Sequence, residues 1–315
     1  MTDLRPMLAT PGPLPSGDQW SYEVKYDGIR ALVEIDSERA LTITTRAGNV
    51  VTGTFPEVAA IVDALDGSSV VLDGEMVAMG DDGLPSFHRL QERLGVFGSE
   101  ALRRSSRIPV VFVVFDLLSI NAMSTCDLPL ASRRALLDRL GGLQTGAHWR
   151  RITTYEDGEA LLELTRSTGI EGVVAKRDDG RYLPGQRSAS WIKVRNLTTD
   201  EFVIGVWVPG EGRRQRTIGA VLLGLPESDE PSAPLRWIGK VGTGFTDAML
   251  DELHALLAPD ARESRPFIND PGERTAVFVE PRHRCLVEYR EWSPTGVLRF
   301  PSWRGLVRPG PTLVP

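Results

Sequence analysis

The pattern of expected secondary structure changes after roughly the first 200 residues, and this change limits the folds that the chain can adopt. Before it, short strand patterns alternate with amphipathic helical patterns such as those at 56–65 and 159–168. After it, short apolar segments are separated by glycine, proline and charged turns, with one helical pattern at 247–257. We therefore expect an α+β domain over 1–197, followed by a small β-barrel domain over 198–315.

The composition of the chain excludes several classes of protein. The longest uninterrupted apolar run, 110–115, is far too short to cross a lipid bilayer. Two cysteines in 315 residues do not form a disulfide framework, and four scattered histidines do not suggest a zinc site. We therefore expect a cytoplasmic protein with no membrane partner. Because the net charge is −6, any site for a polyanion must be a local patch.

Lysine is rare in this chain. Of 36 basic residues only four are lysines, namely Lys25, Lys176, Lys193 and Lys240, and the others are arginines. An ammonium group can lose its proton and act as a nucleophile, whereas a guanidinium group is effectively always charged. A lysine here either marks a position where arginine would fail or has survived by chance. The residues around each lysine decide between these interpretations.

The sequence around Lys25 favours a chemical role. On a strand, Glu23, Lys25 and Asp27 would project to one face, because side chains alternate along a strand. Gly28 would then turn the chain and bring Arg30 back on the next strand. One interpretation is a lysine nucleophile beside an anion-binding arginine. The other is an exposed strand that carries weak surface ion pairs.

Six motifs decide between these interpretations, because in this order they resemble those of the covalent nucleotidyltransferases. This superfamily contains DNA ligases, RNA ligases and mRNA capping enzymes. The motifs are KYDGIR (25–30), TRAGNVVT (45–52), LDGEMV (72–77), FVVFDLL (112–118), EGVVAK (171–176) and SWIKVR (190–195). A single such motif carries a substantial false-positive risk, whereas six in order over nearly 200 residues do not. The segments PMLA (6–9) and YLPGQRSASW (182–191) further resemble bacterial ATP-dependent DNA ligases, most of all the ligase module of end-joining enzymes of the ligase C and ligase D type.

The resemblance implies a fold and a nucleophile for the first domain. The fold is an ATP-grasp-like nucleotidyltransferase domain that performs adenylation. Lys25 would attack the α-phosphorus of ATP as a neutral amine and carry AMP as a covalent intermediate. By position in the motifs, four further side chains would neutralise the phosphate charge as pyrophosphate leaves: Arg30, Arg46, Arg187 and Lys193.

The resemblance also assigns the rest of the nucleotide site. Glu75 and Glu171 would bind Mg²⁺ or Mn²⁺, and either could instead hold the ribose. Phe115 would stack on the adenine ring. Glu23 would contact the edge of adenine and help to select ATP over GTP, and Lys176 would also contact the nucleotide.

The second domain resembles the OB-fold barrel that follows the nucleotidyltransferase domain of DNA ligases. Three side chains in its best-matched segments, 237–247 and 299–306, are expected to contact nucleic acid: Lys240, Arg299 and Arg304. The last motif departs from the family pattern, which ends in Arg-x-Asp-Lys, because this chain reads LVRPG at 306–310. In the family the missing Asp and Lys orient the leaving pyrophosphate, so the departure bears on self-adenylation.

Together these features predict an ATP-dependent DNA ligase that seals breaks with a 3′-hydroxyl and a 5′-phosphate, in DNA repair. The expected partner is nicked or broken double-stranded DNA, bound by a monomer associated with the nucleoid. A DNA-end-binding protein or a polymerase is a further expected partner. Two alternatives stay open. One is an RNA ligase or capping-type enzyme, which labelling with GTP would reveal; the other is a non-catalytic relative that binds nicked DNA without forming a lysine adduct.

Overall fold

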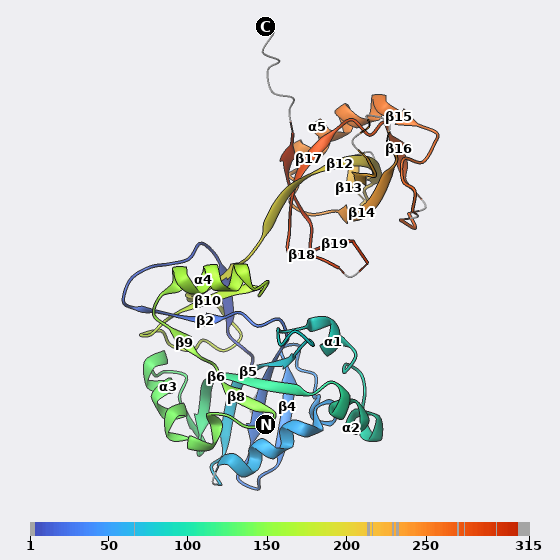
Figure 1. Ribbon diagram of the computed structural model, residues 1–315. Helices are drawn as coiled ribbons and strands as arrows, with labels where there is room; N and C mark the ends of the chain where they lie inside the picture. The colour runs from blue at the N-terminus through green and yellow to red at the C-terminus, as the bar shows by residue number, and fades with distance from the viewer. Residues whose placement is uncertain are drawn as a thin grey trace. The chain divides into compact units, whose positions relative to one another are not determined.

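A computed structural model describes residues 4–65, 67–212, 215, 217–228, 230, 233–269, 271–273, 275–293 and 295–307 of the chain. The chain divides into two compact units, 1–196 and 197–315, and Figure 1 shows the course of the chain through each of them. Within the described residues, every helix is too short or too polar to span a membrane.

The first unit combines strands with short helices on their outer faces. In chain order its elements are β1 (Leu8–Pro11), β2 (Trp20–Val24), β3 (Ile29–Ile35), β4 (Leu41–Thr45), the 3₁₀ helices η1 (Thr52–Thr54) and η2 (Pro56–Leu65), β5 (Val70–Ala78), α1 (Phe87–Gln91), α2 (Gly98–Arg107), β6 (Val110–Ile120), β7 (Met123–Ser124), α3 (Leu130–Arg139), the 3₁₀ helix η3 (Gly141–Leu143), β8 (Trp149–Arg151), β9 (Thr154–Tyr155), α4 (Gly158–Ser167), β10 (Gly172–Arg177) and β11 (Arg187–Arg195).

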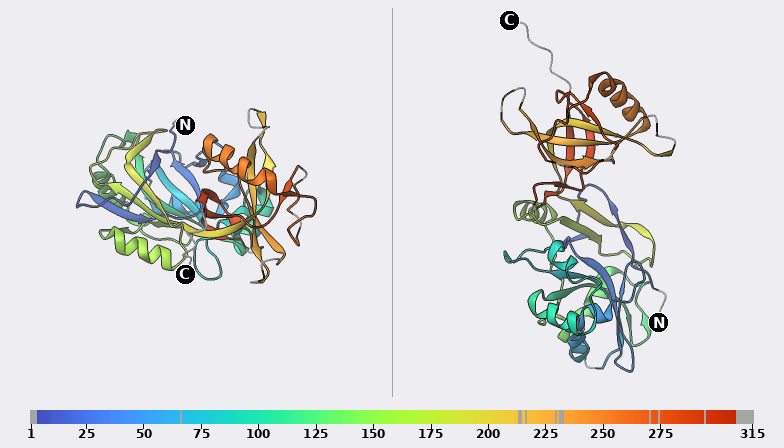
Figure 2. Two further views of the ribbon diagram at one scale, coloured as in Figure 1. Left: turned by 90° about the horizontal axis from the view of Figure 1, so that it is seen from above. Right: turned by 90° about the vertical axis from the view of Figure 1, so that its right-hand side faces the viewer.

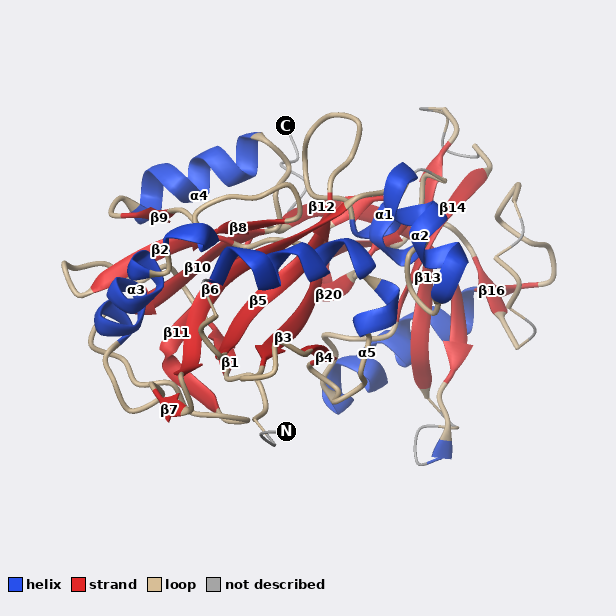
Figure 3. Ribbon diagram, turned by 90° about the horizontal axis from the view of Figure 1, so that it is seen from below, coloured by secondary structure: helices blue, strands red, loops and turns tan. Residues whose placement is uncertain are grey.

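These strands form two sheets. One has five strands in the order β1-β11-β10-β2-β9, and the other has six, in the order β4-β3-β5-β6-β7 with β8 beside β6. Helix α4 covers β10 and β2, α3 packs on β6, and helical segments cross one face of the β5–β6 region (Figure 3). The antiparallel register places Arg30 opposite Glu75 and Asp73 opposite Asp116.

The sequence of strand β6 is apolar at almost every position because both faces of the strand are covered. Phe112 and Val114 belong to the core that packs against η2, whereas Val113 and Phe115 belong to a second core on the opposite face. Alternation along the strand sends successive side chains to these two cores. A strand covered on both faces reads as a continuous apolar run rather than an alternating one. Phe115 therefore faces the second core, which also contains Trp191 and Tyr182.

The structure differs from the sequence-based expectation at Lys25. Strand β2 ends at Val24, so Lys25 lies in the segment that carries the chain from the five-stranded sheet to the six-stranded sheet, not on a strand with Glu23 and Asp27. The crossing brings the backbone very close to strand β5, because a Cβ atom built on Gly28 would lie 2.2 Å from the carbonyl oxygen of Met76. Glycine is required there because no side chain fits.

The second unit is mostly β-structure. Its elements are β12 (Thr198–Pro209), β13 (Ile218–Pro226), β14 (Leu235–Val241), α5 (Asp247–Leu257), the 3₁₀ helix η5 (Ala258–Asp260), β15 (Ala261–Arg262), β16 (Val277–Val279), β17 (Arg284–Tyr289), β18 (Glu291–Trp292), β19 (Leu298–Arg299) and β20 (Ser302–Leu306).

Helix α5 closes the core of this second unit. The strands pair in the order β14-β13-β12-β16-β15, and β17 joins β12 to β20. Thr246 caps the helix by accepting a hydrogen bond from the backbone N–H of Met249 at 3.2 Å. Leu250, Leu253 and Leu257 lie on one helix face and belong to the core of this unit. Figure 2 shows the ribbon of this helix beside the strands of its unit. A curved sheet with one α-helix in the described residues agrees with the expected OB-fold barrel.

Candidate active site

A cavity of about 230 Å³ in the first unit collects the predicted nucleotide-binding residues. The residues that line it come from β1, β2, β3, β5, β6, β10 and β11 and from the segments that follow β2, β4 and β8. The predicted residues on its wall are Glu23, Lys25, Arg30, Arg46, Glu75, Phe115, Lys176, Arg187 and Lys193. Residues up to about 170 positions apart in the sequence therefore meet at one cavity.

The predicted nucleophile is held in an ion pair. The backbone N–H of Lys25 donates to the carbonyl oxygen of Gly172 at 2.8 Å, which fixes the start of the segment after β2. The Lys25 ammonium group donates to Oε2 of Glu171, a carboxylate that is buried. Nε of Arg195 lies 3.3 Å from the other oxygen of Glu171. Glu171 thus does not line the cavity itself but reaches it through Lys25.

The predicted phosphate contact Arg30 is engaged by the protein. Its guanidinium donates to both oxygens of Asp73, at 2.5 and 2.6 Å, and Nη2 also donates to the carbonyl oxygen of Met7 at 3.2 Å. The hydroxyl of Tyr182 donates to Oδ2 of Asp73 at 2.6 Å and accepts from the backbone N–H of Met7 at 2.9 Å. Burial opposes the charge of Arg30, but Asp73 outweighs it and raises the pKa of Arg30. Arg30 is therefore a neutralised, fixed part of the wall rather than a free cation.

One end of the cavity is aromatic and carries two cations over its rings. Phe115 and Trp191 are in edge-to-face contact, with ring centroids 6.0 Å apart. The Lys176 ammonium lies 4.2 Å from each ring centroid, and the Arg30 guanidinium lies 4.5 Å from that of Phe115. Such cation–π contacts are strongest where water is excluded. Burial lowers the pKa of Lys176, which is almost fully enclosed. A purine that stacks on Phe115 would share the ring with these cations.

Glu23 lies at the same aromatic end. Its side chain is buried, Oε2 lies 2.6 Å from Nζ of Lys176, and Oε1 accepts a hydrogen bond from Nη2 of Arg134 at 2.7 Å. Both carboxylate oxygens therefore have cationic neighbours. The predicted contacts Glu23, Phe115 and Lys176 form one cluster, which also includes Arg134 on α3.

The cavity wall also carries cations outside the aromatic cluster. Arg46, Arg187 and Lys193 line it, and none of the ion pairs among the described residues involves any of the three. The guanidinium of Arg187 donates to the backbone carbonyl of Ala9 instead. Burial and the neighbouring charges of Arg195, Lys25 and Arg187 lower the pKa of Lys193. Uncompensated positive charge of this kind is suited to the phosphates of a nucleotide.

The two predicted metal ligands lie close enough to repel each other. Burial raises the pKa of Glu75 to about 7, while Arg30 and Lys25 oppose this shift and Asp73 and Glu171 add to it. No group of three or more His, Cys, Asp or Glu side chains among the described residues could hold a metal by itself. Two carboxylates nevertheless suit Mg²⁺, which commonly takes one or two carboxylates together with phosphate oxygens of the substrate.

The predicted nucleic-acid contacts of the second unit are each paired with a carboxylate. Nζ of Lys240 donates to Glu273, and Arg304 donates from Nε to Glu288 at 3.1 Å and forms a second bond through Nη2. Nη1 of Arg299 lies 3.3 Å from Oε1 of Glu291. These cations are half-exposed or exposed on separate strands, β14, β19 and β20. Of the unusual last motif, 308–310 lie outside the described residues.

Sequence reasoning missed the residues that hold the predicted ones in place. Asp73, Tyr182, Arg133 and Arg134 were not singled out, although each binds a residue in or next to the cavity. A signal was available for Arg133, since Asp116 interrupts an apolar strand and a buried carboxylate needs a partner. No local signal distinguished Arg134 from a solvent-facing helix residue.

Comparisons with known proteins agree with this arrangement. Residues 6–195 match the family described as "ATP dependent DNA ligase domain", and 214–309 match "ATP dependent DNA ligase C terminal region". Over 313 residues the chain is 38% identical to the multifunctional non-homologous end joining DNA repair protein LigD of Mycobacterium tuberculosis, covering 96% of this chain and 38% of that protein. It is 31% identical over 327 residues to a DNA ligase of Thermococcus onnurineus, covering 96% of this chain and 55% of that ligase.

Solved structures extend the likeness to three dimensions. The ligase domain of M. tuberculosis LigD aligns with a TM-score of 0.57 at 36% identity, covering 97% of this chain and 95% of that one. A mycobacterial DNA ligase D complexed with ATP and MES aligns with the same score and identity, over 98% and 96% of the two chains. The chain spans about two fifths of the length of the LigD relatives, matching their ligase part. On these grounds the chain belongs to the ATP-dependent DNA ligase family.

Proposed function

We propose that this chain seals breaks in DNA that carry a 3′-hydroxyl and a 5′-phosphate, through a lysyl-AMP intermediate on Lys25. The observation that carries the proposal is that Lys25 lines one cavity together with aromatic rings and with cations. The rings of Phe115 and Trp191 suit a purine, and the cations of Arg187 and Lys193 suit phosphates. A mononucleotide bound to both groups would bring its α-phosphate to the Lys25 amine.

The first step is a displacement at phosphorus. The Lys25 amine forms a P–N bond to the α-phosphorus, the bond from this phosphorus to the bridging oxygen breaks, and pyrophosphate leaves. Lys25 must first lose a proton, and the Glu171 carboxylate that contacts Nζ is placed to accept it. Arg46, Arg187 and Lys193 stabilise the charge that develops on the leaving pyrophosphate.

The second and third steps pass AMP onward. The 5′-phosphate of the DNA displaces Lys25 from AMP, which gives DNA-adenylate, and the 3′-hydroxyl then displaces AMP and closes the strand. We propose that the adenylation domain covers 1–197 and the second domain 198–315. The second domain would hold duplex DNA through Lys240, Arg299 and Arg304.

A divalent metal ion fits the cavity in the same proposal. Mg²⁺ or Mn²⁺ held by Glu75 and Glu171 together with phosphate oxygens would supply Lewis-acid neutralisation of the phosphate charge. Mutual repulsion of the two carboxylates, which contributes to the raised pKa of Glu75, is a cost that a cation between them would remove.

The biological setting is proposed from the relatives. LigD proteins are named as multifunctional non-homologous end joining proteins, and this chain matches only their ligase part. We infer a role in repair of broken double-stranded DNA, by a monomer in the cytoplasm at the nucleoid. A DNA-end-binding protein or a polymerase is a further proposed partner.

A sealing assay tests the proposal. A duplex with one labelled, nicked strand is incubated with the protein, ATP and Mg²⁺ or Mn²⁺, beside Lys25→Ala. We expect full-length labelled strand only with the wild type and ATP. Sealing with GTP, or of RNA ends alone, would favour the RNA ligase or capping-type alternative. Binding to the nick without any sealing, by protein that also takes no label from α-labelled ATP, would favour a non-catalytic relative.

A further inference from the structure

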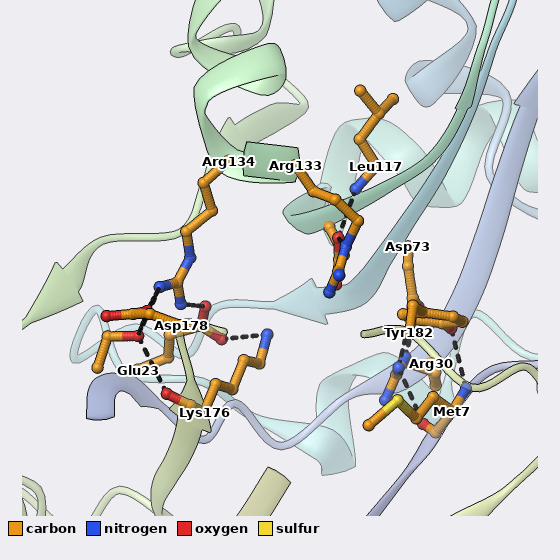
Figure 4. A network of polar contacts seen from close by, with 12 residues as sticks. Met7, Glu23, Arg30, Asp73, Leu117, Arg133, Arg134, Lys176, Asp178 and Tyr182 are labelled. Carbon is orange, nitrogen blue, oxygen red and sulfur yellow. Dashed lines mark hydrogen bonds and ion pairs between the residues drawn. The ribbon is translucent and has the colours of Figure 1, made fainter. Parts of the chain in front are cut away.

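Helix α3 lies outside all six motifs and yet contacts the aromatic end of the cavity. Two neighbouring residues of this helix, Arg133 and Arg134, extend toward different strands, as Figure 4 shows. Both are buried, at 0% and 9% relative exposure. Burying two adjacent arginines on one helix is costly unless each has a bound partner. Their partners therefore indicate what the helix does.

Arg134 supports Glu23 from behind. Nη2 donates to Oε1 of Glu23 at 2.7 Å, while Nη1 donates to Oγ of Ser21 at 2.5 Å and to Oδ1 of Asp178 at 3.0 Å. Ser21 in turn donates to the same oxygen of Asp178 at 2.7 Å. Glu23 lines the cavity, whereas Arg134 is not among the described residues that line it. Arg134 can therefore act on a bound nucleotide only through Glu23.

Arg133 supports the aromatic wall in a parallel way. Its Nε and Nη2 donate to the two oxygens of Asp116 at 2.6 and 2.8 Å, and both side chains are fully buried. Asp116 follows Phe115 directly on β6. Nη1 of Arg133 also donates to the backbone carbonyls of Leu128 and Gly180, at 2.7 and 3.0 Å. Helix α3 thus anchors one ring and one carboxylate that meet at the same end of the cavity.

We propose that Arg134 is a positioning residue that makes the site select adenine over guanine, by holding the Glu23 carboxylate as a hydrogen-bond acceptor. The inference rests on the proposed function, and it assigns base selection to a helix outside the motifs. The carbon-6 substituent of adenine is an amino group, which donates hydrogen bonds, whereas that of guanine is a carbonyl oxygen, which accepts them. An ionised carboxylate only accepts. It therefore favours adenine as long as it keeps its orientation.

The geometry explains why Arg134 is needed for this. Without Arg134, Oε1 of the buried Glu23 carboxylate would lose a charge-assisted hydrogen bond, and the carboxylate would be free to turn away from the edge of the base. Lys176 compensates the second oxygen, at 2.6 Å, but its own charge is disfavoured by burial, which lowers its pKa. The charged groups around Glu23 are Arg134, Lys176 and Arg151, with Asp178 held behind Arg134. Arg134 gives Oε1 a rigid, always-charged partner.

The test compares transfer of label from α-labelled ATP and from α-labelled GTP to the protein, under single-turnover conditions. The variants are Arg134→Gln, Arg134→Lys and, as a matched control, Arg139→Gln, which changes an exposed arginine of the same helix. We expect Arg134→Gln to reduce the ratio of kcat/KM for ATP to that for GTP by about 10- to 100-fold, the effect of one charged hydrogen bond. Arg134→Lys should restore part of the ratio, and Arg139→Gln should leave it unchanged.

A merely structural role gives a different result. It would lower the melting temperature and reduce both rates together, so an unchanged ratio in a folded Arg134→Gln variant would overturn the inference. If that variant does not fold, Arg134→Lys carries the test, and a ratio in that variant equal to the wild-type ratio would overturn the inference. Combining Arg134→Gln with Glu23→Gln should cost no more selectivity than Glu23→Gln alone; additive losses would contradict the inference. If the wild-type protein takes no label from ATP, that result would instead refute the proposed function itself.

Discussion

The ion pairs around the cavity of the first unit are more buried than those of the predicted DNA-binding cations of the second unit, and the difference separates two kinds of binding. In the first unit, the side chains of Lys176 and Glu23 are each 2% exposed, and those of Arg133 and Asp116 are each 0% exposed. In the second unit, Lys240 and Glu273 are 44% and 24% exposed, and Arg304 and Glu288 are 44% and 20% exposed. Buried ion pairs cost free energy because both charges lose their hydration, and their side chains are held in one geometry. Exposed pairs are weak and exchange partners readily.

The difference in burial of these ion pairs bears on what each unit can recognise. A cavity with fixed charges can distinguish one nucleotide from another, because a wrong base leaves a buried polar group without a partner. A surface whose cations already have carboxylate partners can bind a phosphate backbone only by exchanging those partners. Such binding is sequence-independent and strongly dependent on salt. The net charge of −6 is compatible with DNA binding on this view, because the exchange is local.

The largest effect should come from a substitution of Lys25 that keeps its positive charge and removes its nucleophilic amine. Lys25→Arg retains a cation beside Glu171, but a guanidinium does not become a neutral nucleophile at ordinary pH. We expect AMP transfer to fall by a factor on the order of 10³ or more, as for loss of a nucleophile elsewhere. The readout is label from α-labelled ATP on the protein, with the melting temperature as a control for folding. Appreciable transfer by this variant would rule out Lys25 as the nucleophile.

The next largest effect should be on stability, when one ion pair is broken in each unit. Arg133→Met leaves Asp116 as a buried charge without its partner and should lower the free energy of unfolding of the first unit by about 3–5 kcal/mol. Arg304→Met breaks a half-exposed pair and should cost less than about 1 kcal/mol. Urea unfolding of both variants, followed by tryptophan fluorescence, measures the two costs. Equal costs would mean that burial does not distinguish these pairs.

A third prediction concerns pH and the metal-free protein. Burial raises the pKa of Glu75 from 4.5 in the unfolded chain to about 7 in the fold, so the folded state binds more protons between these values. The contribution of Glu75 to stability is therefore full below about pH 4.5 and is lost as pH rises through about 7. Glu75→Gln removes this dependence. Melting temperatures between pH 5 and 8 should fall less steeply for Glu75→Gln than for wild type, and parallel curves would show that Glu75 has an ordinary pKa.

The smallest effect is expected on the surface of the second unit. Arg304→Met should weaken binding to nicked duplex DNA by a few-fold and reduce the slope of log K against log salt by about 1, as for one phosphate contact. Glu288→Gln frees Arg304 from its carboxylate partner and should strengthen binding slightly. Titrations at several salt concentrations measure both. If neither variant changes the slope, Arg304 does not contact DNA.

The residues with chemical roles could be predicted, whereas most of their supports could not. Lys25, Glu75 and Lys193 lie in short motifs, so local sequence was enough to single them out, and the cavity brings them together. The partner of Glu23 lies 111 positions away on α3, a helix outside the motifs, and that of Arg30 is 43 positions away. Such pairs depend on how the two sheets and α3 pack, which no local pattern encodes.

The fold shows the same difference between features with a local sequence signal and features that depend on long-range packing. The expected helical segments at 159–168 and 247–257 correspond within a residue to α4 and α5, because apolar spacing and capping residues are local signals. The expectation that Lys25 and Asp27 share a strand with Glu23 was wrong, because β2 ends at Val24, where the chain leaves one sheet to enter the other. Neither the expected strand nor its neighbours contained a signal for that crossing, apart from Gly28.

The most direct test of the central claim is to locate the AMP adduct. The protein is incubated with ATP and Mg²⁺, digested and analysed by mass spectrometry under conditions that preserve a phosphoramidate bond. Because the chain has only four lysines, each is readily assigned to its own peptide. The account predicts the mass of one AMP on the peptide that contains Lys25 and none on those with Lys176, Lys193 or Lys240. An adduct on another lysine, or no adduct on protein first stripped of AMP with pyrophosphate, would contradict it.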